Sequence, residues 1–126
     1  MTWLLVGSGG ALGAMARHAI NRWWLSSYVV TDFPAGSIFL INVAGSGLIG
    51  LIAGVVAADR LSISSEARIF FTVGLLGGFT TFSSFSLDTL TLMKAGLLGM
   101  ALVNVVGQVG LSLVAVLLGY RLGLWL

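Results

Sequence analysis

The chain has 126 residues, of which 58% are hydrophobic and only 8% charged, and its mean hydropathy is +1.09. Soluble domains carry about 25% charged residues, so this composition predicts an integral membrane protein and excludes an ordinary soluble domain. The net charge of +2 comes without any Lys/Arg run, which argues against a nucleic-acid partner. With no cysteine and a single histidine, His18, the chain also lacks the usual residues of a zinc or haem site.

Four stretches are long and apolar enough to predict membrane-spanning helices, which need about 20 mostly apolar residues. In chain order they are Trp3–Ile20, Ala35–Ala58, Ile69–Leu87 and Ala95–Tyr120. A signal peptide carries positive charge before its apolar run, whereas here Arg17 and Arg22 follow it, so we expect the first span to be retained. The expected fold is an all-α integral membrane protein with four transmembrane helices.

The third predicted span contains an unusual stretch, GLLGGFTTFSSFSLD, at residues 74–88. Glycine and β-branched threonine are weak helix formers, and Ser and Thr hydroxyls compete for backbone groups. We therefore expect a break near Gly77–Thr81. Irregular backbone at membrane depth is tolerated only where protein buries it or water reaches it, and broken helices present carbonyl and N–H groups near the midplane. The stretch predicts an ion site.

Polar side chains also recur at helical spacing in two other spans. Asn42 and Ser46 lie one turn apart in the second span, and Asn104, Gln108 and Ser112 recur every four residues in the fourth. Such residues either form interhelical hydrogen bonds, worth about 0.6 kcal/mol each in a membrane, or line a polar path. For Asn42 both interpretations stay open, and for the stripe of the fourth span we favour the path.

The side chains available inside the spans favour an anion as the ligand. Asp88, near the end of the third span, is the nearest carboxylate, while Asn, Ser and Thr donors and Arg17 near one mouth suit a negative ion. Phe82 and Phe85 either pack in the core, which is the commoner use of such pairs, or turn their positive ring edges to the anion. No nucleophile–base set, P-loop or metal-ligand spacing is present, so we predict that the chain is not an enzyme.

The positive residues are evenly divided between the two predicted sides of the membrane. One side holds Arg60, Arg68 and Arg121, and the other holds Arg17, Arg22 and Lys94. Orientation normally follows a Lys/Arg bias. Its absence predicts insertion in both orientations and pairing with an inverted copy, unless so small a count decides nothing.

Small residues at four-residue spacing form rows that let helices approach closely. These rows are Gly9 with Gly13, and Ser46 with Gly50 and Gly54. They fit packing within one chain, a dimer face, or both.

Residues 77–86, GGFTTFSSFS, closely resemble the GGxTTFSxFS motif of the Fluc (CrcB) family of fluoride channels. Supporting matches are Gly10-Ala-Leu-Gly13 leading to Arg17, and Pro34-Ala-Gly36 leading to Asn42-Val-Ala-Gly45. The resemblance covers essentially the whole chain. It implies that residues 1–126 form a single four-helix transmembrane channel domain in the cell (inner or plasma) membrane. It also implies an antiparallel homodimer with two pores that passively exports fluoride from the cytoplasm and relieves fluoride toxicity.

The resemblance also implies roles for individual residues. It places seven along the fluoride pore: Asn42, Thr81, Phe82, Ser83, Ser84, Phe85 and Ser112. Arg17 matches an arginine near a vestibule, and the backbone carbonyls of Gly77 and Thr80 match those that hold a structural Na⁺ at the dimer centre. Family members differ at the positions of Asn104 and Gln108, and Asp88 replaces a glutamate, so the resemblance gives these three no role.

Two other functions compete with this interpretation. A small dual-topology multidrug exporter has a similar length, but it depends on a membrane carboxylate in its first span, which this chain lacks. A non-transporting helical subunit would explain the rows of small residues. It would not explain a polar stripe together with a broken helix.

Overall fold

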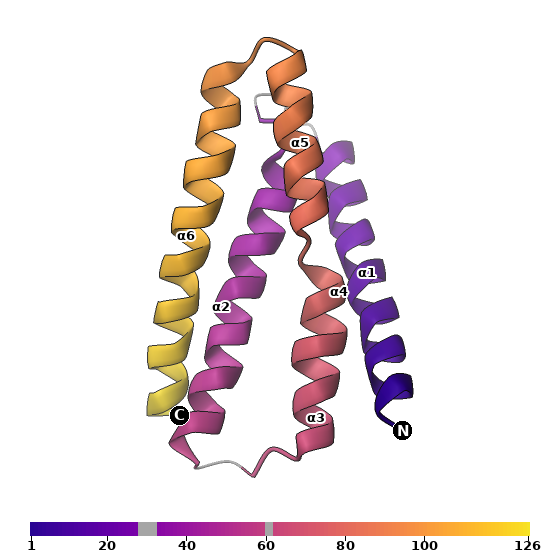
Figure 1. Ribbon diagram of the computed structural model, residues 1–126, viewed down its shortest axis with the longest axis vertical. Coiled ribbons are helices and arrows are strands. Elements are labelled where there is room, and N and C mark those ends of the chain that lie inside the picture. The colour runs from indigo at the N-terminus through magenta and orange to yellow at the C-terminus, as the bar shows by residue number, and fades with distance from the viewer. Residues whose placement is uncertain (28–32, 60–61) are drawn as a thin grey trace.

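The computed structural model describes residues 1–27, 33–59 and 62–126, and every regular element in these ranges is a helix. Three long helices and one composite helix stand side by side (Figure 1). The long helices are α1 (Thr2–Ser26), α2 (Gly36–Ala58) and α6 (Leu98–Trp125). The composite consists of α3 (Ser65–Ile69), the π-helix η1 (Phe70–Leu76), α4 (Gly77–Phe79) and α5 (Phe82–Lys94). The all-α prediction is confirmed for these ranges, whereas Arg60 lies outside the described residues.

Three of the described helices are long and apolar enough to cross a membrane: Gly36–Ala58, Ser65–Lys94 and Leu98–Trp125. The first predicted span does form a helix, α1, but α1 is not among these three because Arg17, His18 and several glycines lower its hydropathy. Both termini lie at the same end of the molecule (Figure 1), as an even number of passes requires. A membrane crossing by α1 stays a prediction.

The third and fourth spans have different bounds from those predicted, because local capping decides where the helices end. The hydroxyl of Ser64 accepts from Ala67 N at 3.1 Å and starts α3 four residues before the predicted Ile69. At the other end Gly96 has a φ of 75°, and Leu97 N donates to Leu92 O at 2.9 Å. This left-handed glycine ends α5 in a Schellman motif, so α6 begins only at Leu98.

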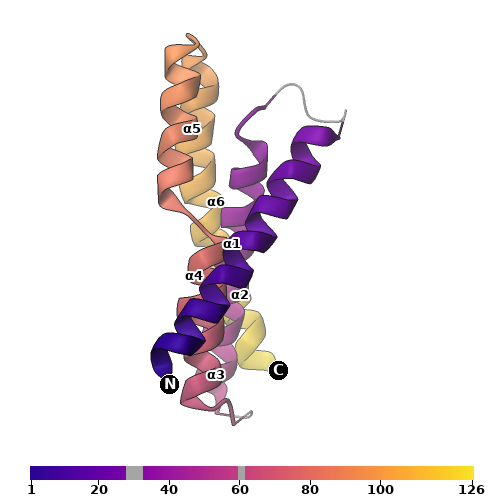
Figure 2. The same cartoon turned by 90° about the vertical axis from the view of Figure 1, so that its right-hand side faces the viewer.

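Two residues of extended backbone separate α4 from α5. Thr80 has a ψ of 150° and Thr81 has φ and ψ of −152° and 122°, whereas Gly77 and Gly78 are helical. Thr81 then caps α5, since its hydroxyl accepts from Ser84 N at 3.3 Å. The change of direction lets η1 and α4 pack on α1 while α5 packs on α6, as the side view in Figure 2 shows.

The rows of small residues pack within the chain. A Cβ added to Gly13 of α1 would lie 2.7 Å from Phe79 N, and Cβ atoms on Gly50 and Gly54 of α2 would meet the carbonyls of Val116 and Tyr120 in α6. These glycines therefore bring backbones together inside the bundle. Their use as a dimer face stays a prediction.

Candidate functional site: a polar pocket at the Thr80–Thr81 segment

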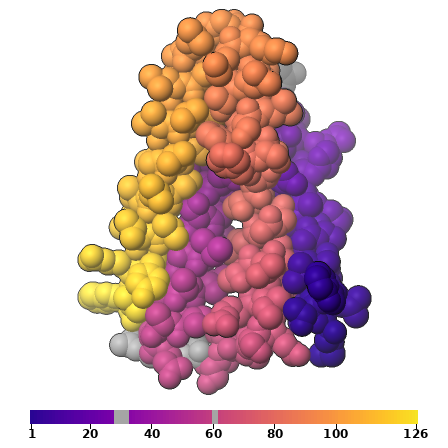
Figure 3. Space-filling model, in the orientation of Figure 1, coloured from indigo at the N-terminus to yellow at the C-terminus, as the bar shows by residue number. Residues whose placement is uncertain are grey.

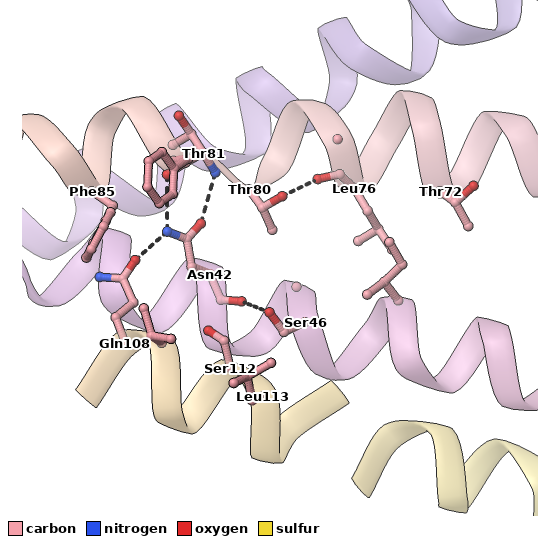
Figure 4. Close-up of a pocket in the computed structure, with 15 residues that line it drawn as sticks. Asn42, Ser46, Thr72, Leu76, Thr80, Thr81, Phe85, Gln108, Ser112 and Leu113 are labelled. Carbon is pink, nitrogen blue, oxygen red and sulfur yellow. Dashed lines mark hydrogen bonds between the residues drawn. The ribbon is translucent and has the colours of Figure 1, made fainter. Parts of the chain in front are cut away.

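A cavity of about 380 Å³ lies between α2, the composite helix and α6 (Figure 4). In the space-filling view the surface is hollowed between α2, in magenta, and the coral segment of η1 and α4 (Figure 3). Seven of the sequence-predicted site residues line the cavity: Asn42, Gly77, Thr80, Thr81, Phe82, Phe85 and Ser112. None of the described residues around it is a carboxylate. The structure thus gathers most of the predicted site from three separate segments.

Asn42 joins α2 to the extended segment. Its Oδ1 accepts from Thr81 N at 2.9 Å, and its Nδ2 donates to the carbonyl oxygen of Thr81 at 3.2 Å (Figure 4). One side chain therefore pairs both backbone groups of Thr81. Backbone groups inside a protein are costly when they lack a partner. Asn42 Nδ2 also donates to Gln108 Oε1, which ties the same amide to α6.

The polar stripe of α6 divides into two kinds of residue. Asn104 and Gln108 are 0% and 3% exposed, and Gln108 Nε2 donates to Asn104 Oδ1 at 3.1 Å. Asn104 Nδ2 in turn donates to Thr89 Oγ1 of α5 at 2.9 Å. Only Gln108 and Ser112 line the cavity. The stripe is thus partly a helix contact and partly a wall of the pocket, so both interpretations left open by the sequence apply to it.

The two phenylalanines differ in their surroundings although their rings are neighbours. Their centroids lie 5.2 Å apart with the planes tilted by 46°. Phe85 is only 8% exposed and packs with Ile38 and Ile41 of α2, whereas Phe82 is 77% exposed in the single chain. Core packing therefore accounts for Phe85 in part, but for Phe82 hardly at all.

The remaining predicted residues lie outside this cavity. Arg17 Nη1 donates to Ser84 Oγ at 3.4 Å, and both residues line a second cavity of about 180 Å³ with His18 and Asn21. The Nε of Arg17 is buried and has no hydrogen-bond partner among the described residues. Ser83 is exposed, and its hydroxyl lies 2.9 Å from Thr81 Oγ1. Ser83 and Ser84 therefore do not share a wall with Asn42.

The extended segment also frees backbone carbonyls. In a continuous helix the carbonyl of Gly77 would accept from Thr81 N, and that of Thr80 from Ser84 N. Here Thr81 N donates to Asn42 Oδ1 and Ser84 N donates to Thr81 Oγ1. The oxygens of Gly77 and Thr80 are thereby left without their helical partners.

Two features of the site escaped the sequence analysis. Thr89 bonds Asn104, and its only sequence signal is a hydroxyl four residues after Phe85 on the same helical face. The π-helix η1 precedes the extended segment and carries Gly74 against Gly9 of α1. Single-turn π-bulges are often found at functional sites, but no residue pattern in FFTVGLL predicts one.

Comparison with known proteins bears on what this pocket does. A family model described as "CrcB-like protein, Camphor Resistance (CrcB)" matches residues 4–120. The chain belongs to the CrcB family. Among its curated relatives is the fluoride-specific ion channel FluC 2 of Nitrobacter hamburgensis, 47% identical over 97% of this chain and 96% of the relative. The fluoride-specific ion channels FluC of Thermus thermophilus and Rhizobium meliloti are 46% and 44% identical, over 96% and 94% of this chain and 92% and 93% of theirs.

The CrcB match covers every residue that lines either cavity. The family resemblance stated from the GGFTTFSSFS motif is confirmed. The relatives are named as ion channels, which agrees with the prediction that the chain is not an enzyme.

Proposed function

We propose that the chain is a passive, selective fluoride channel that lets fluoride leave the cytoplasm across the cell membrane and so relieves its toxicity. The observation that carries this proposal is the pocket itself. Residues from the family motif and from two other helices converge on one cavity that offers neutral donors and no carboxylate among the described residues. Relatives named fluoride-specific ion channels, aligned over nearly the whole chain, supply the identity of the ion.

The chemistry of the lining suits a small, strongly hydrated anion. The side chains of Ser112 and Gln108 and the hydroxyl of Thr81 present donors without a fixed positive charge. Asn42 lines the same cavity, and its two amide hydrogens are donated to Thr81 O and Gln108 Oε1. Conduction requires binding that is favourable enough to enter and weak enough to leave, and neutral donors meet both conditions. The positive ring edges of Phe82 and Phe85 add weak electrostatic contacts with an anion. Arg17, with Ser84 in the second cavity, attracts the anion to one mouth.

Exchanging a ring for an aliphatic side chain tests the part assigned to the phenylalanines. We expect Phe82→Ile and Phe85→Ile each to lower fluoride efflux from vesicles by about fivefold, the equivalent of about 1 kcal/mol of lost edge contact. Phe79→Ile is the control, because Phe79 packs against the Ile38–Ile41–Phe85 cluster but does not line the cavity. Unchanged flux in both pore variants would remove the ring edges from the mechanism.

The working unit in this proposal is an antiparallel homodimer with two pores. Phe82 is 77% exposed in the single chain although it lines the cavity, and a second copy would cover it. Pairing with an inverted copy requires insertion in both orientations, which the equal division of Lys and Arg between the two sides permits.

Dual insertion has a direct test. A reporter fused to the C-terminus should be active on both sides of the membrane in one population of cells. Adding three lysines to the C-terminal end should bias the reporter to the cytoplasmic side, since Lys/Arg bias sets orientation. A wild-type reporter found wholly on one side would rule out the inverted pairing.

We also propose a structural Na⁺ at the centre of the dimer. The carbonyl oxygens of Gly77 and Thr80, which lose their helical partners to Asn42 and to the Thr81 hydroxyl, suit this cation. Carbonyl oxygens can replace the hydration shell of an alkali ion. Two inverted chains would bring two such pairs together. When bound, the cation supplies fixed positive charge that neutral side chains do not.

The alternative, a small dual-topology multidrug exporter, finds less support. Such an exporter needs a carboxylate within its transport path, and no described residue lining either cavity provides one. Asp88 lies in α5 outside both cavities.

Vesicles loaded with potassium fluoride test the proposed function. A passive channel carries net charge, so fluoride release should be slow until valinomycin lets potassium follow, and then rapid. Empty vesicles provide the control. Release that proceeds equally without valinomycin would indicate coupled transport, and no release under either condition would reject the channel.

A further inference from the structure

Four side chains form a continuous series of hydrogen bonds, the amide network, that links the backbone of Thr81 to the backbone of Phe85. Asn42 Nδ2 donates to Gln108 Oε1, Gln108 Nε2 to Asn104 Oδ1, and Asn104 Nδ2 to Thr89 Oγ1. Thr89 Oγ1 donates to the carbonyl oxygen of Phe85 at 2.8 Å. The amide network therefore connects α2, α6 and α5, and it begins and ends on backbone groups of the GGFTTFSSFS motif.

The direction of every bond in the amide network follows from its two ends. Thr81 N can only donate, so it requires the oxygen of Asn42, which turns the nitrogen of that amide towards Gln108. Gln108 therefore faces Asn42 with its oxygen and Asn104 with its nitrogen, and Asn104 is oriented in the same sense. The Thr89 hydroxyl accepts from Asn104 and keeps its own hydrogen to donate. The Phe85 carbonyl can only accept, and it receives that hydrogen. Both ends thus impose the same polarity.

Burial makes this polarity costly to reverse. Asn104 is 0% exposed and does not line the cavity, so water does not reach it to replace a lost partner, and Gln108 is only 3% exposed. A carboxamide turned by 180° would place nitrogen against nitrogen or oxygen against oxygen along the amide network. The Gln108 amide has two hydrogens and donates one to Asn104, so the other stays available on a residue that lines the pocket.

We propose that Thr89 and Asn104 are positioning residues for conduction. They do not line the cavity; they hold the amides of Asn42 and Gln108 in the one orientation that keeps the Thr81 backbone paired and a Gln108 N–H free for the anion. This inference rests on the proposed fluoride channel. It extends the functional site to a hydroxyl in α5 that lies outside the pocket.

A matched pair of threonines in α5 tests the proposal. Thr89→Val removes the hydroxyl with little change of shape, and we expect fluoride efflux to fall about tenfold because the amide network loses its fixed end. Thr91→Val is the control, because Thr91 Oγ1 makes the same bond to the carbonyl four residues before it, Leu87 O at 2.9 Å, but contacts no amide of the network. Thr89→Ser should restore flux to within about twofold of wild type.

A second measurement does not depend on flux. The chain has one glutamine and three asparagines, so the side-chain amide signals of ¹⁵N-labelled protein in nanodiscs are few. Thr89→Val should shift the signals of Asn104, Gln108 and Asn42, and leave that of Asn21, which accepts from Ser37 Oγ at 2.6 Å, in place.

The two measurements test the positioning role separately from the channel function. Wild-type protein that does not conduct would reject the proposed function. The amide signals would still show whether Thr89 orients the amides of Asn104, Gln108 and Asn42. A Thr89→Val protein that conducts like wild type, or whose spectrum changes at Asn104 alone, would overturn the positioning role. So would equal loss of flux in Thr91→Val.

Discussion

Replacing Asn42 by aspartate should nearly abolish fluoride efflux. The new carboxylate can donate to neither Thr81 O nor Gln108 Oε1, and it places a negative charge in the cavity that the anion must cross. Two like charges about 4 Å apart repel by about 4 kcal/mol at an effective dielectric constant of 20. That energy corresponds to roughly a thousandfold loss of flux.

Asn42→Ala separates the two causes of this loss. Alanine loses both donations and also the oxygen that accepts from Thr81 N, but it adds no charge, so its flux should fall much less than that of Asn42→Asp. Size-exclusion chromatography of both variants checks that assembly is retained. Equal flux in the two variants would contradict the idea that an anion passes Asn42.

The second large effect is expected in stability, at the contact of α2 with α6. A Cβ added to Gly119 would lie 3.0 Å from Leu51 N and closer still to the carbonyl oxygen of Gly47. Neither backbone can move without parting the helices, so Gly119→Ala should destabilise the fold by about 1–3 kcal/mol, the usual cost of overpacking. The midpoint of thermal aggregation in detergent measures this loss.

Gly110→Ala is the matched control in the same helix. Nothing lies within 4 Å of a Cβ added at Gly110, so only the helix propensity of alanine should act there, and stability should stay equal or rise. If both variants melt at the same temperature, the close approach of α2 to α6 does not stabilise the fold.

Features within a single span could be predicted from the sequence because their signals are local. Glycines and threonines weaken a helix wherever they stand, and amides at four-residue spacing share a face. Asn42, Thr81, Phe85 and Ser112 stand on three different segments and were grouped by the family resemblance, and the structure places all four around one cavity. The rows of small residues likewise packed helix against helix.

The sequence alone does not decide outcomes that depend on neighbours in space. Ser83 and Ser84 are adjacent, yet one is exposed and the other accepts from Arg17, because α5 leaves the extended segment in a direction that only packing sets. For the stripe of α6 the path was favoured; Gln108 does line the cavity, while Asn104 and Gln108 also form hydrogen bonds with α5 and α2 inside the bundle.

Ion selectivity of the wild-type protein tests the central claim most directly. Vesicles loaded with equal fluoride and chloride, and followed by two ion-selective electrodes after valinomycin is added, report both anions at once. The pocket of neutral donors at Thr80–Thr81 predicts rapid loss of fluoride while chloride stays inside. Release of both anions, or of neither, would contradict the account.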